Sequence, residues 1–433
     1  MKSLADIAAA LEGYDPQALP AASVNEFLAA MVPAPEQTEA LPIMQALGRV
    51  LAQDIVSPID VPPHDNSAMD GYALHGAALS THAQVRLKIA GRAMAGQALG
   101  APIEVGQCLH IMTGAVLPPG LDTVVPQEMV SLQGPWIEIA PGTVQAGANR
   151  RLRGEDVAQG CVALAKGTVL GPAAIGLLAS LGLASVSVYR KLRVAFFSTG
   201  DEILSLGDRP REGAVYDSNR YTVWGMLQRM GIECIDLGVV RDDPALLEAA
   251  FRSAAAQADA IVTSGGVSVG EADHTKAMMQ QLAHSDCAGE GGVAFWRIAM
   301  RPGRPMAVGR IGRVPLFGLP GNPVAVMVTF LAFVRPALWQ MMGARADDPQ
   351  VHTPMLQARS SEAIRKKPGR TEYQRAVVSR AADGSLQVRT TGQQGSGVLS
   401  SMVQANGLMV LAHAQGNIAV GDNVEVMMFA GVL

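Results

Sequence analysis

Apolar runs of strand length alternate with segments of helical period between residues 191 and 342. The helical segments are residues 218–231, 243–257 and 273–283, where apolar residues recur at helical spacing. The strand-like runs themselves are residues 193–199, 233–240, 260–266, 294–300, 305–311 and 314–319. Strand following helix in this way is typical of a doubly wound α/β domain with a mostly parallel sheet.

The flanking parts of the chain follow other patterns. A helix is expected before residue 35, where Ser23 and Glu26 have the spacing of a capping box. Short β-rich runs broken by Gly and Pro then predict a small β domain, and strands with Gly, Asn or Asp turns predict a C-terminal all-β domain. The chain is therefore expected to be multidomain α/β plus β. The predicted domains are a helical and extended domain (1–60 with 151–190), a β-rich domain (61–150), the α/β domain (191–342) and the C-terminal β domain (350–433).

Composition places the chain among ordinary globular proteins, since 49% of its 433 residues are hydrophobic and 17% are charged. The formal net charge is −4, so no global field attracts nucleic acid or an anionic membrane. The four cysteines include no C-x-x-C pair, which argues against a zinc knuckle or a disulfide framework and favours a reducing cytoplasm. The N-terminus lacks the pattern of a signal peptide. The most apolar run, residues 324–334, is too short to span a bilayer, so we expect a buried helix.

Acidic residues follow three successive strands of the predicted sheet. Glu202 comes after the first strand, Asp242 after the second, and Asp273 after the third. Any one of them alone is more often a helix N-cap. Together they lie where open α/β sheets bind ligands, and like charges crowded there repel unless a cation offsets them. Oxygen ligands without His or Cys favour Mg²⁺, so these three carboxylates are the predicted metal site.

A loop rich in glycine and serine follows the third strand, in the stretch TSGGVSVGEAD. It is neither a P-loop nor a dinucleotide fingerprint, and a simple turn is the plainest interpretation of its glycines. Backbone N–H groups beside Ser264 and Ser268 would nevertheless suit an anion at a helix start. We expect residues 264–270, with Gly265 and Gly266, to face an anion and residues 271–273 to face the metal.

Arginines gather after the fourth strand, in the stretch WRIAMRPGRP. A run of charge is usually a solvated face, but prolines and a glycine here restrict the loop that holds Arg301 and Arg304. Guanidinium forks match tetrahedral oxyanions and stay charged, so an oxyanion site that also includes Arg297 and Pro305 is the alternative. The turn LPGNP, residues 319–323, is expected to start the last helix of the domain.

Eight motifs together resemble the MoeA-type molybdopterin molybdenumtransferases, a family that includes the C-terminal domain of gephyrin. The motifs are DNSAMDGYA, IMTGAVLPPG, RLRGED, FSTGDE, YDSNR, SGGVSVGEAD, RPGRP and GLPGNPVA, in the family's order over nearly the whole chain. The resemblance implies a MogA-like central α/β domain. It also implies an enzyme that binds adenylylated molybdopterin and molybdate, inserts molybdenum and releases AMP with a divalent cation.

Matching the motifs residue by residue implies functional roles. The resemblance gives catalytic roles to Asp70, Thr113, Glu202, Asp242 and Asp273. With the loop residues above, the predicted substrate- and molybdate-binding set is Ser264, Gly265, Gly266, Ser268, Arg297, Arg301, Arg304, Pro305, Pro320 and Pro323, joined by Arg370 and Ser396 from the C-terminal domain. The family is dimeric, which implies a homodimer in which Asp70 and Thr113 reach the α/β site of the partner subunit.

Two departures from the family pattern bear on these roles. Lys is common where this chain has Arg297, Arg301 and Arg304, and His is common where it has Gln393. Two rival functions stay open: a molybdopterin adenylyltransferase, which shares the α/β domain, and a gephyrin-like scaffold. The flanking domains argue against the first rival and the lack of a second enzyme domain against the second. A molybdopterin-adenylylating protein and cofactor acceptor proteins are candidate partners.

Overall fold

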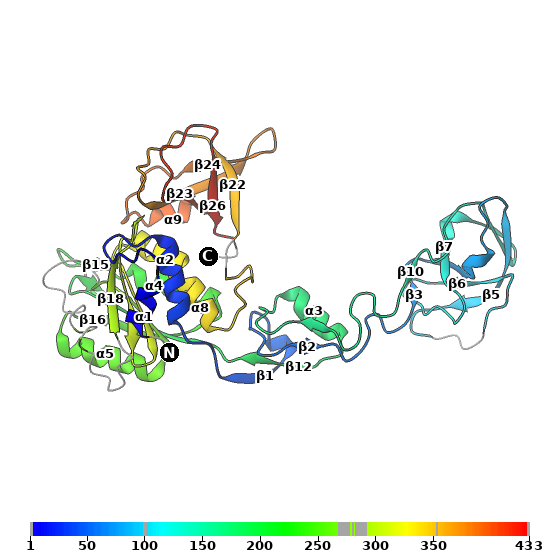
Figure 1. Ribbon diagram of the computed structural model, residues 1–433, viewed down its shortest axis with the longest axis horizontal. Coiled ribbons are helices and arrows are strands. Elements are labelled where there is room, and N and C mark those ends of the chain that lie inside the picture. Colours follow the sequence, from blue (N-terminus) through cyan, green and yellow to red (C-terminus); the bar gives the residue numbers. More distant parts are fainter. Residues whose placement is uncertain are drawn as a thin grey trace.

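The computed structural model describes residues 3–97, 102–266, 278, 281, 292–351 and 354–430. It is an elongated molecule with two bulky ends (Figure 1). One end holds the N-terminal helices, the α/β domain and the C-terminal β domain, and the other end is a small β domain. A slender segment joins the two ends, so the separation between them limits which side chains a single chain can bring together.

The α/β domain is built on a six-stranded sheet in the order β16-β13-β17-β21-β20-β18. The first four strands in this order are parallel, and β20 and β18 are antiparallel to their neighbours. The predicted α/β fold with a mostly parallel sheet is confirmed. The strands are β13 (Arg193–Thr199), β16 (Glu233–Val240), β17 (Ala260–Ser264), β18 (Gly292–Arg297), β20 (Pro305–Ile311) and β21 (Val314–Leu319).

Strand β13 is buried on both faces, which explains its continuous apolar sequence. Phe196 lies in the core that includes side chains of α4 (Ser218–Arg229), while Phe197 packs edge-on against Phe251 of α5 (Pro244–Gln257), with ring centroids 5.0 Å apart. Helices therefore cover both sides of the sheet. Two short strands, β14 (Ile203–Leu204) and β15 (Val215–Tyr216), pair in the loop that leads from β13 to α4.

A helical run from Pro323 to Met341 forms the centre of this domain. It comprises α7 (Pro323–Thr329), a π-helical turn η4 (Phe330–Val334) and α8 (Arg335–Met341). Its 19 residues have a mean hydropathy of 1.6, enough in length and composition to cross a membrane, yet 83% of its most apolar window is buried within the protein. The run is a core helix, as the sequence predicts.

Two N-terminal helices, α1 (Leu4–Ala9) and α2 (Ala21–Met31), pack against the α/β domain rather than along the slender segment. Phe27 of α2 meets the Trp296 ring edge-on, with centroids 4.7 Å apart. The packing of these helices differs from their predicted grouping with residues 151–190. The reason is their apolar faces, which join the core around α8.

The start of α2 also differs from the sequence prediction. The helix begins at Ala21, directly after Pro20, and no side chain caps its first turn. Ser23 and Glu26 lie inside the helix, so the predicted capping box is wrong. A capping box does occur earlier, between Ser3 and Asp6 at the start of α1.

The slender segment consists of paired pieces of chain that run out to the small β domain and back. Its core contains Leu51, Leu178 and Val188. Helix α3 (Pro172–Ser180) begins with proline in its first turn. The paired strands are β1 (Thr38–Pro42) with β12 (Ser185–Tyr189), β2 (Ile55–Val56) with β11 (Val162–Leu164), and β3 (Asn66–Ser67) with β10 (Arg150–Arg151), and η1 spans Ile43–Gln45.

The small β domain has a six-stranded sheet of its own, in the order β7-β4-β6-β5-β9-β8. Two separate apolar clusters lie on it, one containing Leu109 and Val124 and the other containing Leu74 and Ile137. The elements are β4 (Gly71–Leu74), η2 (Gly76–Ala78), β5 (Val85–Ala93), β6 (Gln107–Ile111), β7 (Thr123–Pro126), η3 (Gln127–Met129), β8 (Val130–Gln133) and β9 (Trp136–Ile139).

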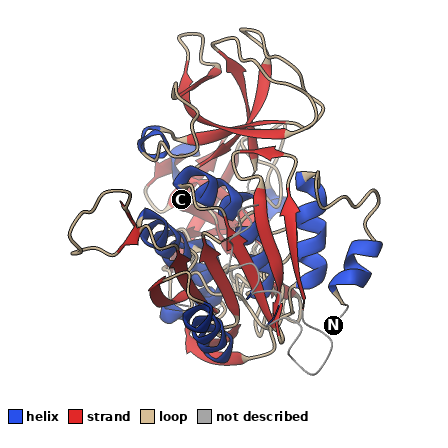
Figure 2. Ribbon diagram, turned by 90° about the vertical axis from the view of Figure 1, so that its left-hand side faces the viewer, coloured by secondary structure: helices blue, strands red, loops and turns tan. Residues whose placement is uncertain are grey.

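The C-terminal domain is a closed five-stranded barrel that lies above the α/β domain (Figure 2). The ring runs β23-β24-β22-β26-β25 and closes where β25 pairs with β23. A short strand of the α/β domain, β19 (Met300–Arg301), adds to β23 and joins the two domains. The barrel elements are β22 (Met355–Ser360), β23 (Thr371–Arg380), β24 (Leu386–Thr390), α9 (Ser400–Gln404), β25 (Gly407–Leu411) and β26 (Asn423–Met428).

Candidate active site

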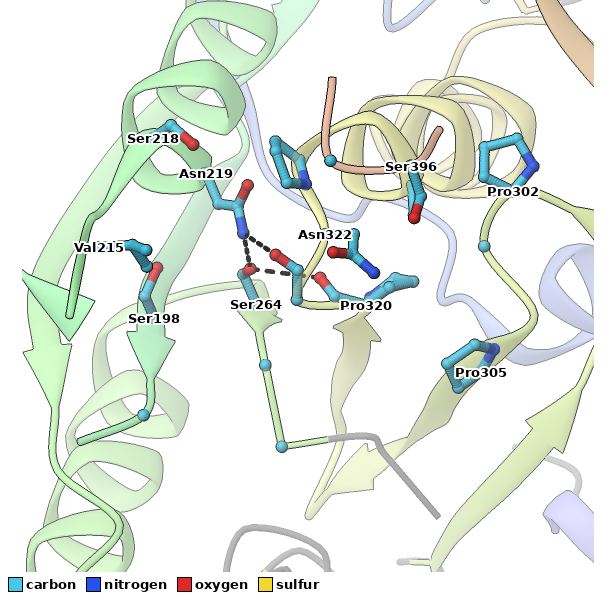
Figure 3. A pocket seen from close by; sticks show the side chains of 18 of the residues that line it. Ser198, Val215, Ser218, Asn219, Ser264, Pro302, Pro305, Pro320, Asn322 and Ser396 are labelled. Carbon is cyan, nitrogen blue, oxygen red and sulfur yellow. Dashed lines mark hydrogen bonds between the residues drawn. The ribbon is translucent and has the colours of Figure 1, made fainter. Parts of the chain in front are cut away.

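A pocket of about 1210 Å³ opens beyond the carboxyl ends of the parallel strands, where open α/β sheets bind ligands (Figure 3). Its walls come from the ends of β13 and β17, the start of α4, the loop from β19 to β20, the turn before α7 and the barrel loop 394–397. The predicted site residues that line it are Glu202, Asp242, Ser264, Gly265, Gly266, Arg301, Arg304, Pro305, Pro320, Pro323, Arg370 and Ser396.

Two of the three predicted metal-binding carboxylates line this pocket. Glu202 follows β13 and Asp242 follows β16, and these strands are neighbours in the sheet. Gly200 has a φ of +142°, and a Cβ there would lie 2.6 Å from Oε2 of Glu202, so the glycine leaves room for the carboxylate. Asp273 lies outside the described residues. Within the part of the chain that the structure describes, no three His, Cys, Asp or Glu side chains are grouped as a complete metal site.

The glycines after β17 turn the chain at the pocket wall. Gly265 and Gly266 have φ angles of +92° and +64°. A Cβ on Gly265 would lie 2.5 Å from the carbonyl oxygen of Thr199, so strand β13 requires a glycine here. A turn packed against β13 is therefore enough to explain why glycines occupy these positions. Ser268 and the rest of that loop lie outside the described residues.

Arg301 and Arg304 reach the pocket from one tight loop. Strand β19 places Arg301 opposite Glu372 of the barrel strand β23. A Cβ on Gly303, which has a φ of +94°, would collide with Oγ1 of Thr329 in α7, so the loop packs closely on that helix. The loop is thus held between the barrel and the core helix, and this packing positions both cations.

Arg297 does not join the other two arginines. It lies on the edge strand β18, opposite Pro305 of β20, and it is absent from the described residues that line the pocket. Its spacing in sequence suggested a third cation in the loop. The strand pairing instead directs residue 297 into the sheet edge.

The barrel contributes Arg370 and Ser396 to the pocket wall. Nε of Arg370 donates to Oε1 of Glu372 at 2.8 Å, and Glu372 is only 2% exposed, so a buried carboxylate orients the guanidinium. The carbonyl oxygen of Ser396 accepts from the backbone N–H of Val324 at 3.1 Å, which ties the loop to the first turn of α7. Pro320 and Pro323 flank the same turn.

Arg375, which sequence reasoning missed, supports the loop that carries Ser396. Its fully buried guanidinium donates to three carbonyl oxygens and one hydroxyl, those of Gln393 (3.1 Å), Gln394 (3.3 Å), Gly395 (2.9 Å) and Ser401 (3.0 Å). Burial, aided by repulsion from Arg301, lowers the pKa of Arg375 to about 10. The guanidinium is therefore still charged at neutral pH. Backbone acceptors leave no mark in the sequence, which is why no motif indicates this role.

Asp217 and Asn219, at the start of α4, also line the pocket and were not predicted. Oδ1 of Asp217 accepts from the Arg220 backbone N–H at 3.1 Å and from the Ser198 hydroxyl at 3.0 Å. Nδ2 of Asn219 donates to Oγ of Ser264 and to the carbonyl oxygen of Gly321, both at 2.7 Å (Figure 3). The YDSNR motif contains both residues, but an Asp before a helix resembles an ordinary N-cap.

Asp70 and Thr113 lie in the small β domain, at the opposite end of the molecule from the pocket (Figure 1). Oδ1 of Asp70 accepts from both the backbone N–H and the hydroxyl of Thr113, each at 2.7 Å. These two hydrogen bonds, the backbone one first, lower the pKa of Asp70. A single chain therefore holds the two residues together but does not bring them to the pocket.

The RLRGED stretch lies at the junction of the slender segment and the small β domain. Nε of Arg153 is 2.5 Å from Oδ2 of Asp60, and Nη1 of Arg150 is 3.7 Å from Oδ2 of Asp65. Both arginines and Asp65 line a separate cleft of about 460 Å³. These arginines therefore form ion pairs at the junction of the two parts of the chain.

Comparison with known domain families matches the chain in three consecutive parts. The matching descriptions are "MoeA N-terminal region (domain I and II)" over residues 20–182, "Probable molybdopterin binding domain" over residues 195–340, and "MoeA C-terminal region (domain IV)" over residues 357–429. The pocket lies between the second and third of these parts.

Individual relatives are similar over nearly the full length. The molybdopterin molybdenumtransferase of Haemophilus influenzae is 39% identical over 402 residues, which cover 93% of this chain and 96% of that protein. Gephyrin of Dictyostelium discoideum is 29% identical, covering 92% of this chain and 60% of gephyrin. A solved MoeA protein from Pyrococcus horikoshii OT3 is 27% identical with a TM-score of 0.77, covering 95% of this chain and all of that one. The chain therefore belongs to the molybdopterin molybdenumtransferase family and is a transferase of molybdenum cofactor biosynthesis.

Proposed function

We propose that this transferase acts on adenylylated molybdopterin and molybdate, releases AMP and requires Mg²⁺. The observation that carries the proposal is the division of charge in one pocket. Glu202 and Asp242 line one part of it, and Arg301 and Arg304 line another. A substrate with phosphates and a bound cation, together with a free tetrahedral oxyanion, matches this division.

The carboxylates present fit a magnesium ion in type and number. Mg²⁺ is usually bound through one or two carboxylates together with substrate phosphates and water, and Glu202 and Asp242 supply two. Asp273 remains the predicted third ligand. When bound, the ion would offset negative charge on the phosphoanhydride as it breaks.

The residues of the chain would position the substrates and neutralise their negative charge, rather than form covalent bonds with them. Arg301 and Arg304 would hold molybdate through charge-assisted hydrogen bonds, and Arg370, oriented by Glu372, would add a third cation at the barrel side. The Ser396 loop would close the site at the start of α7. Groups fixed by packing before the substrate arrives need no reorganisation during the reaction.

A homodimer is part of this proposal. Asp70 and Thr113 are functional in the family resemblance, yet one chain holds them far from its own pocket. We infer that the small β domain of one subunit completes the pocket of its partner. A cytoplasmic location and docking to an adenylylating protein or a cofactor acceptor belong to the same proposal.

The test is a turnover assay on the purified full-length chain. Adenylylated molybdopterin, molybdate and Mg²⁺ are supplied, and AMP is measured by chromatography. We expect AMP release that requires both molybdate and Mg²⁺. Consumption of ATP with molybdopterin would instead indicate the adenylyltransferase. Tight substrate binding without AMP release would indicate a scaffold.

A further inference from the structure

In addition to the unpartnered hydroxyl of Thr199, two buried oxygen atoms that can only accept a hydrogen bond belong to the pocket wall and have no donor within the described part of the chain. They are Oδ2 of Asp217, whose residue is 3% exposed, and Oδ1 of Asn219, whose residue is 8% exposed. A buried acceptor without a partner destabilises the fold, because it has lost its hydrogen bonds to water and gained none. Two such atoms on residues that line one substrate pocket point to donors that the ligand supplies.

Only one of the two carboxylate oxygens of Asp217 has hydrogen-bond partners among the described residues. Its Oδ1 accepts from the Ser198 hydroxyl and from the Arg220 backbone N–H, which is a complete N-cap for α4. A carboxylate accepts through both oxygens, so capping does not explain Oδ2. The second oxygen is buried and has no partner among the described residues.

The orientation of the Asn219 amide follows from its partners. The Gly321 carbonyl can only accept, so the nitrogen of the amide must face it, and Oδ1 is the atom left over. The Ser264 hydroxyl accepts from the same nitrogen and itself donates toward the carbonyl of Pro320 at 3.4 Å (Figure 3). The chain of hydrogen bonds holds Oδ1 as an acceptor.

The spacing of the residues that anchor the two acceptors follows from the sheet. Asp217 is bonded to Ser198 at the end of β13, and Asn219 to Ser264 at the end of β17. Ser198 and Ser264 are opposite each other in the parallel pairing, and adjacent strands lie about 4.8 Å apart. The anchors of the two acceptors are therefore about as far apart as the two sides of one heterocyclic ring.

The matching ligand has two neighbouring N–H donors on one edge. The aminopyrimidinone half of a pterin has this edge, with a ring N–H beside an exocyclic NH₂. Adenine has an exocyclic NH₂ beside a ring nitrogen that accepts, so it matches less well. We propose that Asp217 and Asn219 recognise the aminopyrimidinone edge of molybdopterin. The inference rests on the proposed substrate and names the part of it that this wall of the pocket binds.

The location of the arginines agrees with this assignment. The loop that carries Pro302 and Pro305 lies across the pocket from Ser198 and Ser218 (Figure 3). A ligand whose ring occupies the α4 side would leave the cationic side for oxyanions. The pocket would then bind the neutral ring at its α4 side and the charged oxyanions at its arginine side.

The test measures binding rather than turnover. Binding of molybdopterin, of AMP, and of two ring fragments, pterin and lumazine, is measured by calorimetry or ligand NMR without molybdate or Mg²⁺. Lumazine has oxygen where pterin has the NH₂. We expect wild type to bind pterin at least about tenfold more tightly than lumazine, as expected when a buried acceptor loses its donor. Asp217→Asn should weaken molybdopterin binding about tenfold or more and abolish this preference, with AMP affinity changed less than about twofold.

Asp243→Asn is the matched control. Asp243 caps α5 as Asp217 caps α4, but it does not line the pocket. The control should bind all four ligands as wild type does. Equal affinity of wild type for pterin and lumazine, or a loss of AMP binding as large as that of molybdopterin in Asp217→Asn, would overturn the inference.

The wild-type comparison needs no variant, so it decides the matter even if Asp217→Asn does not fold. Failure of the proposed reaction is distinguishable. If wild type releases no AMP yet prefers pterin over lumazine, the turnover proposal fails and the ring assignment stands. If AMP is released without any pterin preference, only the ring assignment fails.

Discussion

The pocket and the small β domain hold functional side chains by opposite means. The pocket is assembled from segments as distant in sequence as Ser198 and Ser396, and it depends on the packing of two domains. Asp70 and Thr113, in contrast, are joined by two direct hydrogen bonds in a domain with its own apolar clusters. A change in the small β domain should therefore leave the pocket of its own chain intact, whereas a change in the barrel should alter it.

The two regions also differ in whether contacts within one chain are enough to explain the positions of their functional side chains. Contacts within one chain explain the positions of Arg370, of Asn219 and of the loop that holds Arg301, because these contacts also stabilise the fold. The two Thr113 hydrogen bonds account for the lowered pKa of Asp70, but they do not explain why an exposed carboxylate is held so far from the pocket. The proposed dimer supplies the reason, because a carboxylate kept ionised there can serve the site of another subunit.

The largest predicted effect tests whether the two regions form one site across subunits. Asp70→Asn and Arg301→Gln should each lower molybdate-dependent AMP release by on the order of 100-fold, the scale of losing one preorganised charged group. Mixing the two variants under subunit exchange should restore about a quarter of wild-type activity, because half of the dimers are then mixed and each mixed dimer has one intact site.

The control is each variant mixed with itself, which should stay inactive. No recovery on mixing, with subunit exchange verified by native mass spectrometry, would contradict completion of the pocket by the partner subunit. Full activity of Asp70→Asn alone would remove the small β domain from the reaction.

The sequence predicts the parts of this arrangement that local patterns determine. Period and composition locate the strands and helices of the α/β domain, including the core helix from Pro323 to Met341. The strand ends correctly direct Glu202 and Asp242 to the pocket. The second success relies on the rule that parallel strands present their carboxyl ends at one edge.

Features that depend on contacts between distant segments could not be predicted. Arg297 is removed from the pocket by its pairing opposite Pro305 on an edge strand, which its spacing does not reveal. Arg375 acts through backbone carbonyls, and any sequence supplies those. The ligand-facing oxygens of Asp217 and Asn219 become apparent only once their other hydrogen bonds are known.

The second prediction tests the dependence of the pocket on the barrel. In Arg375→Lys the charge stays but the fork is lost, so a compact ammonium cannot bond all three loop carbonyls. We expect the barrel to lose about 2 kcal/mol of stability in chemical denaturation. The KM for molybdate should rise about tenfold, since the loop positions a binding group.

Arg380→Lys is the matched control, because Arg380 is an exposed residue on the same strand β23. It should change neither stability nor KM. Loss of stability in Arg375→Lys with an unchanged KM would show that the barrel loop is structural only.

A smaller effect is expected from Gly200→Ala. The new Cβ would lie 2.6 Å from Oε2 of Glu202 and must displace that carboxylate. Gly207→Ala has a comparable backbone cost, with φ at +97°, but meets nothing within 4 Å. Both variants should lose about 1 kcal/mol of stability. Only Gly200→Ala should weaken Mg²⁺ binding. The Mg²⁺ concentration that gives half-maximal AMP release should rise severalfold in this variant. Equal Mg²⁺ dependence of the two variants would exclude Glu202 from the metal site.

The smallest predicted effect concerns the isolated pair at the other end of the molecule. The Thr113 backbone N–H is the main cause of the lowered pKa of Asp70, and the hydroxyl is the second. Thr113→Val removes the hydroxyl alone, so the pKa should rise but stay below that of an ordinary Asp. Because the folded pKa is depressed, the pair's small stabilisation is present above the unfolded pKa and is lost as pH falls through the folded one. The carboxyl carbon of Asp70, followed by NMR against pH, measures the shift. An unchanged pKa of Asp70 in Thr113→Val would contradict the contribution of the hydroxyl.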